Sequence, residues 1–151
     1  MGQGISCKCN KCGYEFGANL GVGFFYPSLV DETKNAMIKG EFGDSAKKFF
    51  EKNPNGTVDC ENVVARCKKC KEYHVVPKLY LYKPKLGFND KEIMIWDLDT
   101  YFELSEKYQH VCDCGEELEL IENAEEKAVS GELSCLKCGA VMTLNEIIMW
   151  D

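Results

Sequence analysis

The stretch SCKCNKCGYEF, residues 6–16, places three cysteines within six residues: Cys7, Cys9 and Cys12. Two cysteines three apart on a tight turn direct both sulfur atoms to one side, where backbone N–H groups of the turn can donate to them. Gly13 follows Cys12, at a place where the chain must turn with a positive φ. The spacing therefore favours Cys9 and Cys12 as a pair of metal ligands. Cys7 points to the same face as Cys9, so it is either an alternative ligand or a small, part-buried apolar side chain.

The other cysteines repeat this arrangement. The chain has 151 residues and ten cysteines, of which eight fall into four short clusters that we call the first to fourth knuckles. They are CNKC (Cys9, Cys12), CKKC (Cys67, Cys70), CDC (Cys112, Cys114) and CLKC (Cys135, Cys138). Eight thiolates complete two four-cysteine sites, so we expect two Zn²⁺ ions per chain. Iron is the alternative, because the same ligands bind it.

The second and third knuckles depart from the first. Lys71 stands where a glycine follows the other three knuckles, so its turn is expected to differ slightly. The third knuckle is one residue short, and His110 could replace one of its cysteines, although the cysteines are favoured. His74 is interpreted as a strand-face residue, and Cys60 as a small, part-buried one.

The order of the knuckles suggests how they pair. The simplest pairing joins the first with the second and the third with the fourth, and a cross-braced pairing of first with third also fits. Twenty residues separate Cys114 from Cys135, a suitable length for the two hairpins of a zinc ribbon. Fifty-four residues separate Cys12 from Cys67, so the first ribbon requires an insertion.

Helix signals fill that insertion. Ser28 and Asp31 match a capping box, Gly40 ends the first helix, and a second begins at Asp44 or Ser45. The second helix has Ala46, Phe49 and Phe50 on one face.

Turn and strand signals follow. NPNG (53–56) is a turn, and residues 57–82 read as strand, knuckle and strand. A helix is expected where Leu98, Tyr101, Phe102 and Ser105 recur at helical spacing. TLNE (143–146) matches another capping box.

We therefore expect an α+β fold with two zinc-ribbon, rubredoxin-like four-cysteine units. The first unit is residues 1–82, with the helical insertion at 28–53. A linker and a bridging helix occupy 83–109, and the second unit is 110–151. Folding should depend on metal, because structural zinc contributes roughly 10 kcal/mol or more per site.

Composition limits the compartment and the class of protein. Apolar residues make up 45 % of the chain, which permits a packed core. The start, MGQGISCKC, has no apolar segment or cleavage site, and the longest apolar run is too short to span a bilayer. We expect a cytoplasmic protein without membrane contact, where clustered cysteines bind metal more often than they form disulfides.

The net charge of −7 argues against a general nucleic-acid binder. It divides into +3 over residues 1–82 and −10 over 83–151. Basic and aromatic side chains alternate around the first two knuckles, as in single-strand nucleic-acid platforms, but lysines there also offset thiolate charge. The basic residues at the knuckles are Lys8, Lys11, Arg66, Lys68, Lys69 and Lys71. The acidic C-terminal region is either a solvated surface or a docking site for basic groups.

The chain shows no catalytic constellation. It has two histidines, and Gly17, Gly21 and Gly23 do not make a nucleotide fingerprint, because Tyr26 stands where a further glycine is needed. We expect a non-catalytic zinc-binding protein that acts as an interaction or adaptor module for a protein partner. The alternatives are an iron electron carrier and nucleic-acid binding through the basic first ribbon.

Two resemblances bear on this expectation. CNKCGYEF resembles the metal-binding knuckle of rubredoxins and many zinc ribbons. Over the whole chain, MGQGI, CGYEFGANLGVGFFYP, KKFFEKNPNG and IIMWD resemble a family of small zinc-ribbon proteins from clostridia and other Firmicutes. That resemblance implies a cytoplasmic protein, carries a metal-ligand role onto the eight knuckle cysteines and carries no catalytic role. The family has C-x-x-C at the third knuckle, where this chain has CDC.

Overall fold

The computed structural model describes residues 2–87 and 98–150. The chain divides into two compact units, each with its own sheet. Unit 1 consists of Met1–Gly23, Asn62–Pro77 and Gln109–Asp151, and unit 2 of Phe24–Glu61 and Lys78–Tyr108. The chain therefore leaves unit 1 twice to build unit 2. This division differs from the expected segments 1–82, 83–109 and 110–151.

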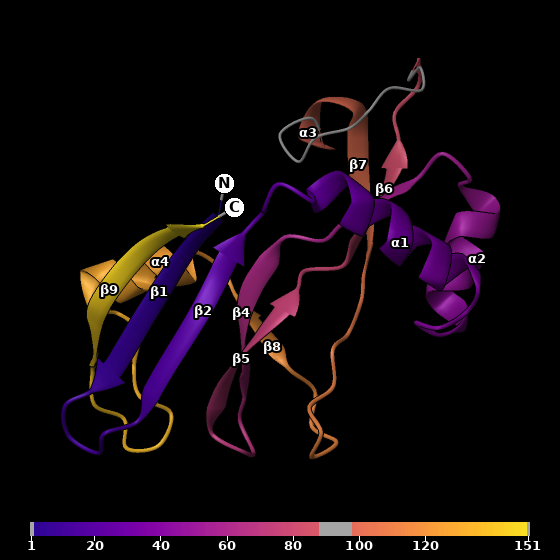
Figure 1. The fold of residues 1–151 in the computed structure, drawn as a ribbon. Helices are drawn as coiled ribbons and strands as arrows, with labels where there is room; N and C mark the ends of the chain where they lie inside the picture. The colour runs from indigo at the N-terminus through magenta and orange to yellow at the C-terminus, as the bar shows by residue number, and fades with distance from the viewer. Residues whose placement is uncertain (1, 88–97, 151) are drawn as a thin grey trace. The chain divides into compact units, whose positions relative to one another are not determined.

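Unit 1 is built on a six-stranded antiparallel sheet (Figure 1). Five strands run in the order β5-β4-β2-β1-β9, and β8 pairs with β4 off this path. The strands are β1 (Gly2–Cys9), β2 (Glu15–Gly21), β4 (Asn62–Cys67), β5 (Glu72–Pro77), β8 (Glu119–Ile121) and β9 (Met142–Trp150). The β1–β2 and β4–β5 hairpins meet through a single pair, Gly21 with Asn62.

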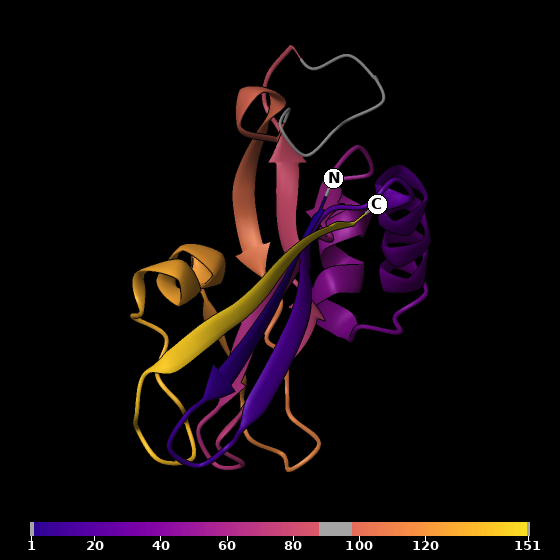
Figure 2. The same cartoon turned by 60° about the vertical axis from the view of Figure 1, so that its left-hand side comes forward.

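The same three-strand plan occurs twice in this sheet. The β1–β2 hairpin has the first knuckle at its turn, and β9, which follows the fourth knuckle, pairs with β1. The β4–β5 hairpin has the second knuckle at its turn, and β8, which follows the third knuckle, pairs with β4. The second plan is therefore nested in sequence inside the first. All four knuckles lie at the same end of unit 1 (Figures 1 and 2).

The core of unit 1 follows from the alternation of side chains along its strands. Phe16, Ala18 and Leu20 on β2 are buried, while the residues between them are exposed. A helix that the sequence did not predict, α4 (Ala124–Ser130), packs its alanines Ala124 and Ala128 into the same cluster.

The capping box expected at TLNE (143–146) is wrong, because these residues belong to β9. Strand β9 pairs with β1, where Met142 lies opposite Cys9 and is 1 % exposed. The pairing with β1 provides these residues with backbone partners, which overrides a local helix signal.

Unit 2 contains the two helices expected at 28–53, as α1 (Tyr26–Ile38) and α2 (Asp44–Lys52). The buried face of α2 is confirmed as Ala46, Phe49 and Phe50, as is the turn that follows. The capping box of the first helix is wrong, because α1 begins earlier, at Tyr26, with a proline in its first turn and no side-chain cap. Proline fixes a φ that suits this position. Gly40 follows the helix end with φ +89°, as expected.

The remainder of unit 2 is a three-stranded sheet in the order β3-β6-β7. Its strands are β3 (Thr57–Asp59), β6 (Tyr80–Pro84) and β7 (Phe102–Lys107). The expected bridging helix is wrong beyond one turn: α3 spans Leu98–Tyr101, and the chain then continues as β7. Phe102 is buried at 1 % exposure, and β7 finds its backbone partners on β6. Part of the expected linker, residues 88–97, lies outside the described residues.

A buried carboxylate in unit 2 contacts three neighbouring residues. Asp59 is 2 % exposed and accepts hydrogen bonds from the Tyr26 hydroxyl (3.2 Å) and the Glu61 backbone N–H (2.9 Å). Lys78 Nζ lies 3.3 Å from its other oxygen. These partners offset the cost of burying the charge. No helix among the described residues is long and apolar enough to cross a membrane.

Candidate metal centres

The eight expected ligands gather into two groups of four. The group that we call the outer site joins the first and fourth knuckles, as Cys9, Cys12, Cys135 and Cys138. The group that we call the inner site joins the second and third knuckles, as Cys67, Cys70, Cys112 and Cys114. In each site the four sulfur atoms lie within 4.8 Å of one another.

This grouping corrects the expected sequential pairing and also differs from the cross-braced one. Strand pairing decides it: β9 returns to β1 and places the fourth knuckle beside the first, while β8 returns to β4 and places the third beside the second. The cysteines of the outer site are far apart in sequence, since Cys12 and Cys135 are 123 positions apart. Sequence distance was therefore a poor guide to the partners.

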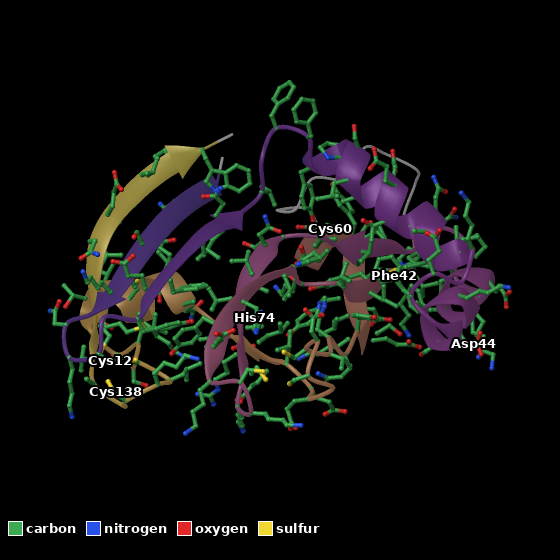
Figure 3. The ribbon with its side chains drawn as sticks, turned by 60° about the horizontal axis from the view of Figure 1, so that its bottom comes forward. Cys12, Phe42, Asp44, Cys60, His74 and Cys138 are labelled. Carbon is green, nitrogen blue, oxygen red and sulfur yellow. The ribbon has the colours of Figure 1, made fainter. Side chains whose placement is uncertain are left out.

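The sulfur separations fit a tetrahedral ion. In the outer site, Sγ of Cys9 lies 3.4 Å from Sγ of Cys138. The inner site is slightly wider, with 3.9 Å between Sγ of Cys70 and Sγ of Cys112. Four sulfurs at the zinc–sulfur bond length stand about 3.8 Å apart in a tetrahedron. None of the ten cysteines is in a disulfide. Figure 3 shows two ligands of the outer site, Cys12 and Cys138, close to each other.

Three knuckles turn in the same way. The backbone N–H of Gly13 donates to the carbonyl of Cys9 (2.9 Å), and Gly139 does the same to Cys135 (2.8 Å). Lys71 donates to the carbonyl of Cys67 at 2.9 Å and has a φ of +55°. The expectation of a different turn there is wrong, because Lys71 adopts the left-handed conformation that glycine adopts elsewhere.

The third knuckle is the exception. Gly115 donates to the carbonyl of Cys112 at 2.8 Å, which closes the turn one residue sooner than in the other knuckles. Gly115 still has a positive φ, +89°. The short C-x-C bite therefore places both of its sulfurs in the inner site.

Backbone donors favour the thiolate form of one cysteine in each site. The N–H of Cys12 donates to Cys9 and lowers the pKa of that thiol to about 6, against the effect of burial. The N–H of Glu116 lowers the pKa of Cys114 to about 7. Metals bind the thiolate, so these donors assist binding.

Crowding opposes full ionisation of the remaining thiols. The pKa of Cys70 is raised to about 12, first by Cys114 and then by Cys67. Four thiols held this close cannot all lose their protons without a positive charge among them. The donor set thus has the chemistry of a site for a thiophilic divalent cation.

His74 lies beside the inner site, and the sequence did not predict this contact. Its Nε2 lies 3.8 Å from Sγ of Cys112. The Nε2 of the other histidine, His110, donates to the carbonyl of Pro77 at 2.7 Å. The available signal was the position of His74 in β5, which returns directly from the second knuckle.

The two remaining cysteines are buried and belong to neither group of four. Cys7 is 1 % exposed in the core of unit 1, where burial raises the pKa of its thiol. Cys60, in unit 2, is 2 % exposed, and burial raises its pKa to about 11. Both are the small apolar side chains that the sequence suggested.

The basic side chains at the knuckles are partly neutralised. Arg66 and Lys68 both pair with Glu119, at 2.9 and 3.3 Å, and Lys8 pairs with Glu15 at 3.4 Å. Tyr73, one of the aromatic residues that follow the second knuckle, is 7 % exposed. A base cannot stack on a ring that is buried in this way.

Comparison of the chain with protein-family models, with curated proteins and with solved structures finds no match. The two cysteine sites and their surroundings are therefore the features of the molecule that bear on its function.

Proposed function

We propose that this is a zinc protein built on two nested zinc ribbons, in which each four-cysteine site holds one structural Zn²⁺. The observation that carries the proposal is the pair of four-sulfur clusters, each supplied by two knuckles. The plan of a hairpin plus a third antiparallel strand, which occurs twice, supports the ribbon assignment.

An ion in such a site cross-links the two knuckles that supply its ligands. A bound cation neutralises thiolates that would otherwise repel one another, and four protein ligands leave no position for a reactive water. The outer site would fix knuckles 123 positions apart, and the inner site knuckles 42 apart. We infer a structural role for both ions and no catalysis at either.

The surface then carries the biological role, and strand β9 supports a protein-interaction module. This strand lies at the edge of the sheet in unit 1. Its residues Ile147, Ile148 and Met149 are 48, 52 and 55 % exposed. Edge strands can bind an extended segment of another protein through their free backbone groups.

Metal analysis tests the proposal directly. Protein purified without added metal and without oxygen should contain two zinc ions per chain and show no visible absorbance. Cys12→Ser should retain one ion, and Cys7→Ser, at a cysteine outside both sites, should retain two. Iron with a visible absorbance that bleaches on reduction would instead favour the electron-carrier alternative, because four thiolates bind iron as well.

A further inference from the structure

The outer and inner sites are joined by side chains that touch both. Tyr73 comes three residues after Cys70 of the inner site, yet its two hydrogen bonds go to the outer site's knuckles. Its hydroxyl donates to the carbonyl of Ser134 at 2.6 Å, directly before Cys135. Its backbone N–H donates to the hydroxyl oxygen of Tyr14 at 3.0 Å, just after the first knuckle.

Lys137 makes the reciprocal connection. It stands between the two cysteines of the fourth knuckle, in the outer site. Its Nζ donates to the carbonyl of Cys70 at 3.2 Å and pairs with Glu72 at 3.3 Å, both on the second knuckle's hairpin. The same ammonium lies 5.7 Å from the centre of the Tyr14 ring.

The contacts of Tyr73 are held in the core. Tyr73 is 7 % exposed, and its ring packs against Phe16 with 5.3 Å between ring centres. A buried hydroxyl that loses its partner costs more free energy than an exposed one. Disorder at the second knuckle would therefore be felt directly at the outer site.

We propose that Tyr14, Tyr73 and Lys137, which we call the relay, couple the two sites, so that metal at one site raises the affinity of the other. The inference rests on the proposed function, since it requires both sites to bind metal. An empty inner site leaves the second knuckle unfixed, and the outer site then loses the groups that position its own knuckles. Linkage makes the effect equal in both directions.

The relay outweighs the effect of chain topology. Filling the inner site shortens the loop that the outer site must close, because the inner site bridges 42 positions of a separation of 123. That shortening improves outer-site affinity only about twofold. The relay's hydrogen bonds, at about fivefold each, multiply to about 10- to 100-fold.

Native mass spectrometry of the full chain tests the coupling. Reduced, metal-free protein receives one equivalent of Zn²⁺, and chains with zero, one and two ions are counted. Two equal, independent sites would leave about half of the chains with one ion. We expect a much smaller one-ion fraction in the natural chain and a rise of several-fold in Y14F/Y73F/K137M.

Matched controls isolate the relay. Lys8→Met removes a lysine beside the outer site whose ion pair stays within one hairpin, and Tyr80→Phe removes a hydroxyl in unit 2. Both should keep the distribution of the natural chain. If the triple variant does not bind two ions at excess zinc, Tyr73→Phe alone, which removes one hydroxyl, replaces it.

A second measurement determines the zinc affinity of the outer site alone. Cys67→Ser removes an inner-site ligand and should weaken zinc binding at the outer site about 10- to 100-fold, but only about twofold when the relay is also changed. An unchanged one-ion fraction in the relay variants, with two ions bound at excess zinc, would overturn the coupling alone. A natural chain that binds no zinc would overturn the proposed function as well.

Discussion

The outer and inner sites share one plan and differ in their knuckle sequences and in the side chains beside the sulfurs. Both combine a hairpin turn with a knuckle whose following strand pairs back onto the hairpin. The outer site has two C-x-x-C knuckles, each followed by glycine. The inner site has one knuckle followed by Lys71 and one shortened to C-x-C. The difference teaches that strand pairing brings the sulfurs together, while the knuckle sequences can vary around that frame.

The groups beside the sulfurs differ as well. Four residues after the second cysteine of each hairpin, the outer site has Phe16 and the inner site has His74. Phe16 packs against the ring of Tyr73, and His74 places Nε2 3.8 Å from Sγ of Cys112. The inner site thus has a histidine nitrogen beside one of its sulfurs, in a place where the outer site has an apolar ring.

Metal removal should have the largest effect. The contrast that it reveals is between the two units, because both sites lie in unit 1. A strong chelator with a reductant should unfold unit 1, because roughly 10 kcal/mol or more per site is lost. Unit 2 has its own buried side chains, Phe49, Phe50 and Phe102 among them. Hydrogen exchange should show lost protection in β1 and β4 and retained protection in α1 and α2. Equal loss in both units would contradict separate stabilities.

Single cysteine changes should separate the two sites and test their pairing. In Cys9→Ser, the three remaining thiols of the outer site should become reactive together, while the inner site stays protected. In Cys114→Ser the pattern should reverse. Alkylation of the folded, zinc-loaded protein followed by mass spectrometry reads each thiol. Reactivity of Cys67 and Cys70 in the first variant would instead restore the sequential pairing, and Cys7→Ala should leave all eight ligands protected.

The features that the sequence predicted are the local ones. The choice of Cys9 over Cys7 agrees with the geometry, since spacing and Gly13 depend on a few adjacent residues. The helices of unit 2 follow from Gly40 and the apolar face of α2 for the same reason. Local patterns of this kind reflect turn geometry and periodicity, which neighbouring residues determine.

The features that failed depend on distant partners. Phe102 fits a helical spacing, but pairing of β7 with β6 decides its conformation. The predicted grouping of the knuckles failed because β1 pairs with β9, a strand at the other end of the sequence. The prediction of a different turn at Lys71 failed because the hairpin imposes a positive φ that a lysine side chain disfavours.

His74 should sharpen the contrast between the sites. His74→Phe makes the inner site resemble the outer one and removes the ring nitrogen near Cys112. An N–H donated from this ring to the thiolate would stabilise metal binding, so inner-site affinity should fall about tenfold. Competition with a chromophoric chelator should show one of the two ions leaving more readily. His74→Gln retains an N–H donor and should recover part of the affinity. Identical release from His74→Phe and the natural chain would show that this histidine does not act on the sulfur.

The smallest expected effect concerns the residue after each hairpin knuckle. Lys71→Gly should stabilise the zinc-loaded protein by about 1 kcal/mol, because a lysine at positive φ is strained and a glycine is not. Gly13→Lys should cost a similar amount, and only for that reason, since a Cβ at Gly13 has no atom within 4 Å. Urea unfolding at fixed free zinc measures both. Lys69→Gly is the control, because Lys69 does not have a positive φ and glycine there should give no gain. If Lys71→Gly and Lys69→Gly behaved alike, the hairpin would not be imposing strain on Lys71, and the two knuckles would be equivalent after all.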